Sequence, residues 1–502
     1  MMTSMLLLMT SVSVSAPIDA WRKDPVRAKV AAVASAEEKP ELVVGVLSDV
    51  HMRTNADWVA TIGNFKKALR FYDRAKADAV FCCGDMIEFG WWDWYHLVGD
   101  CWFEVFPNNR RSDGEPVEKC IIFGDHEIEN FVNPGIVNNY PADFIRAHDI
   151  PTYGRKKIYE EILKEPWAPI MKKTIKGYDV IMANFTFSSN DTEFRSKDCY
   201  WGQNIPHLRE FLSTNALHYA KPFFYLQHKV IARTVIAPNC TGQNELKDRE
   251  TLNAYPNCVA FCGHKHKSAT AEHSLWQDEF TCVQVPSLQS VQTDAGHENG
   301  WASCDGYAPA GRIMPSMRTF EDAGQGLLMK VYRNRIVLER WNLRFEEKVA
   351  ADWVIPWPVK SDHPASFEAR ARSSRPPKFP AGARLDVKTG KGKDRTGAER
   401  ELVTVSFPAA HSAADADRGY DYRVTAELRM HHWTRIACEK LVYSPKICLP
   451  EARDTNAVSC VFTSEQIPPV NDGVRFIVTP YNAFQVPGAA ITSDWKKVEF
   501  GK

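Results

Sequence analysis

Five apolar segments of this 502-residue chain are each followed by an Asp or a His, directly or after one glycine, and this arrangement limits the folds available to it. The segments are residues 41–48, 79–83, 119–123, 222–227 and 258–262. Helix-like patterns separate some of them, as at 57–76, where apolar residues recur on one side. Strands alternating with helices are typical of layered α/β folds, which place their sites at the carboxyl ends of strands. The sequence therefore predicts an α/β domain with its polar residues gathered at one edge.

The rest of the chain divides into further regions. Residues 325–332 and 335–342 read as a hairpin that closes the first domain, which we place at 40–350. Residues 351–400 are rich in Pro, Gly and basic side chains and are predicted to be a linker. Short alternating apolar runs then fill 401–502 without any helix-length pattern, as in an antiparallel β-sandwich. This last region resembles a fibronectin type III domain.

The N-terminus bears on the compartment of the protein. Residues 5–14 form an apolar run that is too short to span a bilayer, and small residues follow it. This pattern predicts a signal peptide at 1–20 and export to a periplasmic or extracellular location, with a cytoplasmic location as the alternative. No later segment is long and apolar enough to span a membrane. The 62 basic and 62 acidic side chains balance, so we expect no nucleic-acid partner.

A set of eight Asp and His side chains follows the apolar segments. The set is Asp49, His51, Asp85, Asp125, His126, His228, His264 and His266. Side chains at i and i+2 just beyond a strand can both turn toward one cavity, which accounts for the D-x-H and H-x-H spacings. Carboxylate and imidazole ligands without cysteine suit Mn, Fe or Zn ions better than a structural thiolate site.

These residues resemble the calcineurin-like metallophosphoesterase family. Its sequence blocks are D-x-H, G-D-x-x, G-N-H-[DE], a lone His and G-H-x-H, and all five occur in this order between Asp49 and His266. The resemblance covers roughly residues 40–345. It implies a β-sandwich flanked by helices and a dinuclear site for two divalent metal ions. It also implies hydrolysis of a small phosphomonoester or phosphodiester by a hydroxide that bridges the ions.

The resemblance also assigns roles to the metal ligands. One ion would be bound by Asp49, His51 and His266. The second ion would be bound by Asp125, His228 and His264. Asp85 would bridge the two ions, because a carboxylate has two oxygens with several lone pairs.

His126 would act outside the metal shell as the catalytic residue, donating to the phosphate or to the leaving oxygen. Glu88, three residues after Asp85, occupies the place where many relatives keep an acid that orients this histidine. Glu127 belongs to the same sequence block and is the alternative orienting residue.

Asp125 departs from the family pattern, which usually has Asn at this place. The oxygen ligand is retained, but an ionised carboxylate adds negative charge and should weaken the attraction for a phosphate dianion. The alternative hypothesis is therefore a catalytically weak or inactive protein that holds metal. Such a protein would act through the β-sandwich, which could contact a glycan or another protein.

Two further regions could contribute to the site. The aromatic stretch from Phe89 to Phe106 could line a substrate pocket, although ordinary core packing explains it equally well. The loop from Gly296 to Arg312 could cover the site, with Arg312 holding a phosphate.

Overall fold

The computed structural model describes most of the chain. The described residues are 38–52, 58–88, 90–128, 154–185, 205–215, 217, 220–235, 245–293, 296–299, 324–394, 398–413, 415–445, 447–451, 457–467 and 472–498. The predicted signal peptide at 1–20 lies outside them. None of the helices in these ranges combines the length and the apolar character needed to cross a bilayer.

The first sheet has, within the described residues, seven strands in the order β12-β11-β10-β1-β2-β3, with β13 also paired to β11. The strands are β1 (Leu42–Leu47), β2 (Ala79–Cys82), β3 (Glu118–Ile121), β10 (Gln325–Tyr332), β11 (Arg335–Asn342), β12 (Glu347–Lys348) and β13 (Trp353–Pro356). β1, β2 and β3 run parallel, and β10 joins β1 antiparallel. The β10–β11 hairpin is the one predicted from the sequence.

The second sheet has six strands among the described residues, in the order β4-β5-β6-β7-β9-β8. The strands are β4 (Ile170–Ile175), β5 (Tyr178–Ala183), β6 (Phe223–Gln227), β7 (Cys258–Cys262), β8 (Leu275–Gln277) and β9 (Thr281–Gln284). β5, β6, β7 and β9 run parallel, so their carboxyl ends lie at one edge.

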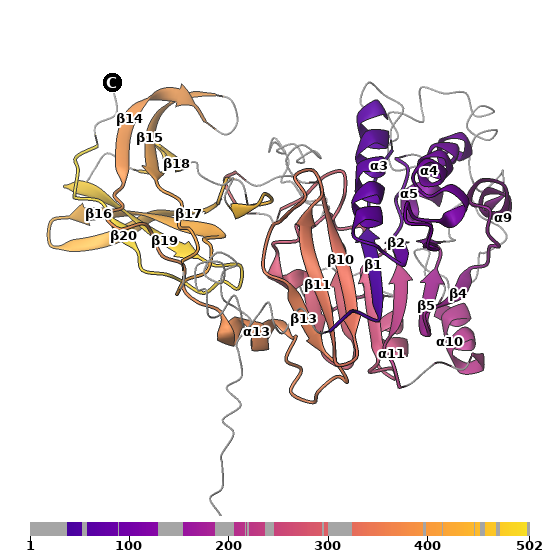
Figure 1. The fold of residues 1–502 in the computed structure, drawn as a ribbon. Helices are drawn as coiled ribbons and strands as arrows, with labels where there is room; N and C mark the ends of the chain where they lie inside the picture. The colour runs from indigo at the N-terminus through magenta and orange to yellow at the C-terminus, as the bar shows by residue number, and fades with distance from the viewer. Residues whose placement is uncertain are drawn as a thin grey trace, which may run out of the picture.

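Helices cover the outer faces of both sheets (Figure 1). The α-helices are α3 (Trp58–Arg74), α4 (Trp92–Val105), α5 (Asp125–Ile128), α9 (Arg155–Ile158), α10 (Ile205–Thr214), α11 (Glu245–Leu252) and α13 (Phe367–Ser373). Short 3-10 turns occur at Pro107–Asn109 and Glu272–Ser274, and a π-helical turn at Tyr159–Leu163. α3 follows the predicted periodicity, because Phe65, Leu69 and Tyr72 are all fully buried on one side.

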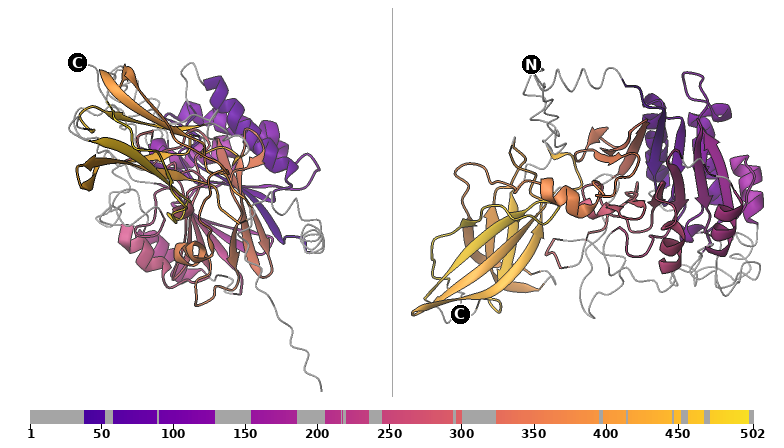
Figure 2. Two further views of the ribbon diagram at one scale, coloured as in Figure 1. Left: turned by 90° about the vertical axis from the view of Figure 1, so that its left-hand side faces the viewer. Right: turned by 90° about the horizontal axis from the view of Figure 1, so that it is seen from below.

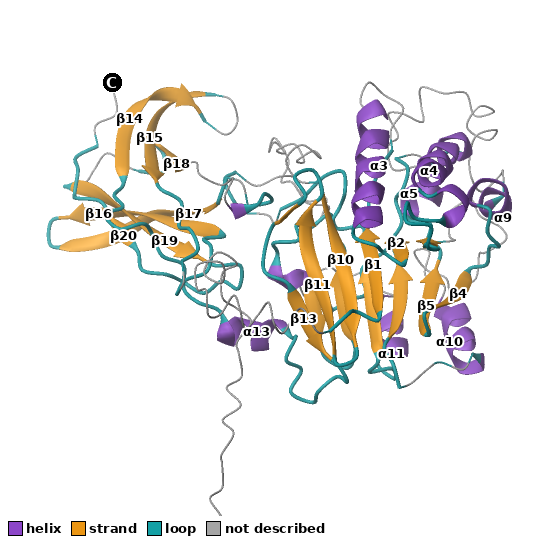
Figure 3. Ribbon diagram, in the orientation of Figure 1, coloured by secondary structure: helices purple, strands orange, loops and turns teal. Residues whose placement is uncertain are grey.

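Three apolar clusters stack in layers through this region. The central cluster lies between the two sheets and contains Val44 and Phe81 of the first sheet and Phe224 and Phe261 of the second. A second cluster lies between the first sheet and helices α3 and α4, and a third between the second sheet and α10. The order helix, sheet, sheet, helix is the predicted β-sandwich flanked by helices, and Figure 3 shows the strands with helices beside them.

The C-terminal region consists of two further sheets (Figures 1 and 2). Within the described residues their orders are β14-β15-β18 and β17-β16-β19-β20. The strands are β14 (Asp386–Lys393), β15 (Glu399–Phe407), β16 (Asp421–Met430), β17 (Trp433–Tyr443), β18 (Val458–Thr463), β19 (Gly473–Tyr481) and β20 (Ile491–Thr492). They enclose a core that includes Val405, Tyr422, Phe462 and Phe476. The predicted all-β region is therefore present, and its likeness to fibronectin type III stays a prediction.

The segment predicted as a linker, residues 351–400, contains regular structure instead. β13 extends the first sheet, α13 packs beside β8, and β14 forms an edge strand of the C-terminal region. Arg370 of α13 reaches the buried Glu272, with which Arg340 also pairs at 2.8 Å. The basic side chains that suggested a solvated surface are thus partly used in buried ion pairs, which composition alone does not reveal.

The C-terminal sheets contact the first region through a short segment around His297. Its Nε2 lies 2.9 Å from Asp421 Oδ2 at the start of β16, and its ring stacks on Tyr443 at 3.6 Å between centroids. The backbone N–H of Glu298 donates to the carbonyl of Leu441.

Candidate metal centre

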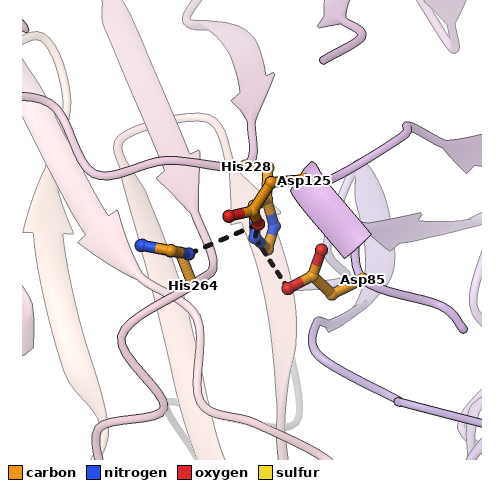
Figure 4. Close-up of side chains that lie close together, drawn as sticks. All are labelled: Asp85, Asp125, His228 and His264. Carbon is orange, nitrogen blue, oxygen red and sulfur yellow. Dashed lines mark ion pairs between the residues drawn. The ribbon is translucent and has the colours of Figure 1, made fainter. Parts of the chain in front are cut away.

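The eight Asp and His side chains all lie at the carboxyl ends of parallel strands or just beyond them. Residues 49 and 51 follow β1, residue 85 follows β2, and residues 125 and 126 begin α5 after β3. Residue 228 follows β6, and residues 264 and 266 follow β7. The loops of the two sheets meet, and Figure 4 shows Asp85 and Asp125 from one sheet facing His228 and His264 from the other.

Backbone hydrogen bonds hold these loops against one another. The N–H groups of Asp49 and His51 donate to the carbonyls of Gly84 and Asp85, each at 3.0 Å. The N–H of His264 donates to both carboxylate oxygens of Asp49 at 3.1 Å, which joins the two sheets. The packing is tight at Gly263, where an added Cβ would lie 2.0 Å from Ser48 Oγ.

Five of the eight residues adopt left-handed backbone conformations although none is glycine. Their φ angles are 53° for Asp49, 46° for His51, 53° for Asp85, 74° for His264 and 50° for His266. Each such residue costs about 1–3 kcal/mol and persists where the surrounding structure imposes it. Such strain is concentrated at functional sites, and here it turns the side chains of neighbouring loops toward one point.

Three of the side chains form what we call the first ligand group: Asp49, His51 and His266. His266 Nε2 lies 3.1 Å from both Asp49 Oδ1 and His51 Nε2. Side-chain oxygens hold the other ring nitrogens, since His51 Nδ1 is 3.0 Å from Glu88 Oε2 and His266 Nδ1 is 3.0 Å from Ser290 Oγ.

Four side chains form the second ligand group: Asp85, Asp125, His228 and His264. His228 Nε2 lies 3.0 Å from Asp85 Oδ2 and 2.9 Å from Asp125 Oδ1, and His228 Nδ1 contacts the backbone carbonyl of Cys83 at 2.7 Å. His264 Nδ1 is 3.5 Å from Asp125 Oδ1. Asp85 Oδ2 is also 3.8 Å from His51 Nε2, so this oxygen lies between the two groups.

These residues fit divalent cations. Asp125 Oδ1 and His228 Nε2 are buried and make no hydrogen bond, although they lie 2.9 Å apart. Buried polar atoms normally have partners, and lone pairs that converge without a hydrogen bond are the arrangement expected of metal ligands. The donors are carboxylate oxygens and imidazole nitrogens, which suit Mn, Fe or Zn.

Comparison with known families agrees with this geometry. Residues 42–268 match the family described as calcineurin-like phosphoesterase. The matched residues contain both ligand groups.

Three solved structures are similar to parts of the chain. A dimetal phosphatase from Danio rerio has 11% identity and a TM-score of 0.37, covering 64% of this chain and 100% of its own. A conserved uncharacterized protein from Streptococcus pneumoniae, a predicted phosphoesterase, has 10% identity, a TM-score of 0.25 and coverages of 63% and 97%. An archaeal phosphodiesterase has 10% identity, a TM-score of 0.21 and coverages of 49% and 85%. No curated protein sequence matches the chain.

His126 lies at the edge of the two ligand groups, with Nε2 4.0 Å from Asp85 Oδ2. Its Nδ1 contacts the backbone carbonyl of Glu88 at 2.7 Å. Glu88 was predicted to orient this histidine through its carboxylate, but the carboxylate faces His51 and the main-chain oxygen faces His126. The reason is local geometry, because the loop after β2 brings its backbone, rather than the side chain, to the ring of His126.

Glu127 was the alternative orienting residue, and its carboxylate serves the loop after β2 instead. It accepts hydrogen bonds from the backbone N–H groups of Asp85 at 3.0 Å, Met86 at 2.6 Å, Ile87 at 3.1 Å and Gly124. Glu127 therefore fixes the loop that carries Asp85, and it is fully buried while doing so.

The charged groups of the two ligand groups shift one another's pKa values strongly. Burial would raise the pKa of Asp49, but the charge and hydrogen bond of His266 hold it far below its usual value. Burial would likewise raise the pKa of Asp125, yet the charges of His264 and Lys229 lower it. For His126, burial lowers the pKa while Asp85 and Asp125 raise it, and the result is about 9. Asp49 and Asp125 thus remain ionised, as metal ligands must be.

Two contacting residues escaped the sequence analysis. Lys229 Nζ lies 3.2 Å from Asp125 Oδ2, and Ser290 holds His266. Lys229 directly follows His228, so the one available signal was a basic residue beside a predicted ligand. Ser290 stands 24 positions after His266, and no motif links the two.

The remaining sequence expectations have mixed outcomes. Trp94, Tyr95, Trp102 and Phe106 are buried in the cluster beneath α3 and α4, so core packing accounts for them. Phe89, Trp301, Tyr307 and Arg312 lie outside the described residues, and the covering role of their loop stays a prediction. His297, at the start of that loop, contacts the C-terminal sheets.

Proposed function

We propose that this protein is a metal-dependent phosphoric ester hydrolase that acts on a small phosphomonoester or phosphodiester. The observation that carries the proposal is the position of Asp85 Oδ2, which lies 3.0 Å from a histidine of the second ligand group and 3.8 Å from one of the first. A carboxylate between two sets of convergent ligands is what a bridging role requires.

The residues would divide the work as follows. The first ligand group would bind one ion, Asp125, His228 and His264 would bind the other, and Asp85 would touch both. When bound, two divalent ions would lower the pKa of a water molecule between them and neutralise charge on the phosphoryl oxygens.

His126 would supply the proton to the leaving oxygen. Its Nδ1 is held by the backbone carbonyl of Glu88, so Nδ1 carries a proton and donates it there, while Nε2 points to the site. Because imidazole titrates near neutral pH in ordinary surroundings, a positioned histidine is a common general acid. Mn, Fe or Zn each suit the donors, and the geometry does not choose among them.

We further propose that the protein is exported and that its C-terminal sheets support the phosphoesterase domain. His297, Glu298 and Asn299 contact strands β16 and β17 through ring stacking and backbone hydrogen bonds. These contacts favour a buttressing role over the alternative of a metal-holding protein that acts through this region on a glycan or protein.

The test is hydrolysis of p-nitrophenyl phosphate and of its bis ester by metal-stripped protein reloaded with Mn²⁺, beside an Asp85→Asn variant. We expect turnover to return with the metal and to vanish in the variant, and the preferred ester would separate monoesterase from diesterase. Metal binding without turnover of either ester would favour the binding-protein alternative. Absence of metal binding would refute the proposal.

A further inference from the structure

The two oxygens of Asp125 have different surroundings. Oδ1 faces the ligand group, 2.9 Å from His228 Nε2 and 3.5 Å from His264 Nδ1. Oδ2 lies 3.2 Å from Lys229 Nζ. Lys229 is only 9% exposed, and its ammonium also lies 5.0 Å from the centroid of the Phe185 ring. A buried lysine thus contacts Oδ2, the oxygen of Asp125 other than the one that lies near His228 and His264.

This contact bears on the residue that departs from the family pattern. An Asn at position 125 would offer one carbonyl oxygen to an ion and would direct two N–H donors at the other side. A carboxylate offers a second acceptor there and brings a full negative charge. A buried charge without a partner is strongly unfavourable, and a nearby ammonium removes that penalty.

We propose that Lys229 is a positioning residue, and that Asp125 and Lys229 together replace the single amide that relatives have at this place. The ammonium fixes Oδ2, directs Oδ1 at the ion, and cancels the additional charge that would repel a phosphate. The predicted effect on ion binding rests on these contacts alone. The predicted effect on phosphate rests also on the proposed function.

The pairing makes an unusual prediction for Asp125→Asn, which installs the residue common in relatives. The new NH₂ group would face the ammonium of Lys229, donor against donor, or the amide would flip and turn its donors toward the ion. Either outcome should weaken Mn²⁺ binding by about 10–100-fold, the range typical of lost supporting contacts. Lys229→Met alone should weaken binding by a similar factor, because it leaves the carboxylate unpaired.

The decisive variant is the double substitution D125N/K229M. It removes both the ammonium that would face the new NH₂ group and the carboxylate that would be left unpaired. Mn²⁺ affinity should therefore return to within a few-fold of that of the natural protein. Calorimetric titration of metal-stripped protein measures this without any substrate. Hydrolysis of p-nitrophenyl phosphate should recover in parallel, mainly through KM, because the pair controls charge at the site of phosphate entry.

A matched control comes from Lys267, which follows His266 as Lys229 follows His228 and is 8% exposed. D125N/K267M should show no recovery relative to D125N, since rescue depends on the contact with Asp125. Lys229→Arg should keep most of the affinity, because it preserves the charge and the donor. Circular dichroism establishes that each variant is folded.

Wild-type Mn²⁺ affinity in the single variant D125N would overturn the inference, and so would additive losses in D125N/K229M. If Lys229→Met alone fails to fold, the comparison of D125N with D125N/K229M and Lys229→Arg still decides the matter. If rescue of ion binding occurs in a protein that hydrolyses neither ester, the pair stands and the proposed function fails.

Discussion

The two ligand groups differ in what holds their histidines. In the first ligand group, both ring nitrogens that face away from the ligands are held by side chains, Glu88 for His51 and Ser290 for His266. In the second, His228 is held by the backbone carbonyl of Cys83. A side-chain support can be altered by one substitution, whereas a carbonyl belongs to the fold. The histidines of the first group can therefore be altered through single side-chain supports, whereas the support of His228 cannot.

The largest effect on metal binding should come from Asp85→Asn. This substitution should affect both ligand groups, because Asp85 Oδ2 lies near a histidine of each. We expect loss of both ions and a fall in hydrolysis beyond the 10–100-fold typical of outer contacts, since a charged oxygen between the ions is replaced by a neutral amide. Metal content by elemental analysis and turnover of p-nitrophenyl phosphate measure this. Retention of one ion at full affinity would show that Asp85 serves a single group.

Glu88→Gln should weaken binding of one ion only. The amide keeps the shape but loses the charge that favours His51 as a donor, so affinity at the first group should fall by about 10–100-fold. Two-site calorimetric titration with Mn²⁺ would reveal one weakened and one unchanged step. Equal weakening of both steps would contradict the assignment of Glu88 to the first ligand group alone.

Ser290→Ala should act on the same group with a smaller effect, because a neutral hydroxyl contact contributes roughly 0.5–1.5 kcal/mol. That range corresponds to a loss of affinity of up to about tenfold. Ser290→Thr retains the hydroxyl and serves as the control. An unchanged affinity in Ser290→Ala would leave Glu88 as the one effective support.

Acidification should lower the stability of the metal-stripped protein through a buried network that lies outside both ligand groups. Burial would raise the pKa of Glu272, but Arg340 and Arg370 lower it below the usual 4.5. A depressed folded-state pKa contributes stability above the unfolded value that is lost as pH falls through the folded one. Chemical unfolding from pH 6 to pH 3 should show this loss.

Glu272→Gln provides the comparison for that experiment. It should cost about 3–5 kcal/mol at neutral pH, because it leaves buried guanidinium groups without their carboxylate. The same variant should lack the part of the acid dependence that Glu272 contributes. An unaltered ratio of the two Mn²⁺ affinities would confirm that the network is separate from the site.

The sequence predicted the strands, and which Asp and His side chains lie close together, for a shared reason. A buried parallel strand is an uninterrupted apolar run, and its end is marked by the first Asp or His, as at Asp49 after β1. The same reasoning failed where contacts are distant in sequence. Helix α13 was read as linker because its role depends on Glu272, nearly a hundred residues earlier. Lys229 and Ser290 were missed because their partners are set by the meeting of two sheets.

The orientation of Glu88 shows the limit most clearly. Spacing placed an acid three residues after Asp85, but spacing does not say whether its carbonyl or its carboxylate faces His126. That choice depends on how the loop after β2 turns, and Glu127 fixes that turn through backbone hydrogen bonds. Motifs specify which residues gather, and the loop hydrogen bonds specify which atoms meet.

The left-handed conformations at Asp49, His51, Asp85, His264 and His266 bear on how the centre would exchange one metal ion for another. Backbone hydrogen bonds between neighbouring loops, and from His264 to Asp49, support this backbone conformation. Exchange of one bound metal for another would then leave these loop contacts in place. The supply of metal ions in the compartment, rather than the chain itself, would then decide which metal ion the protein carries.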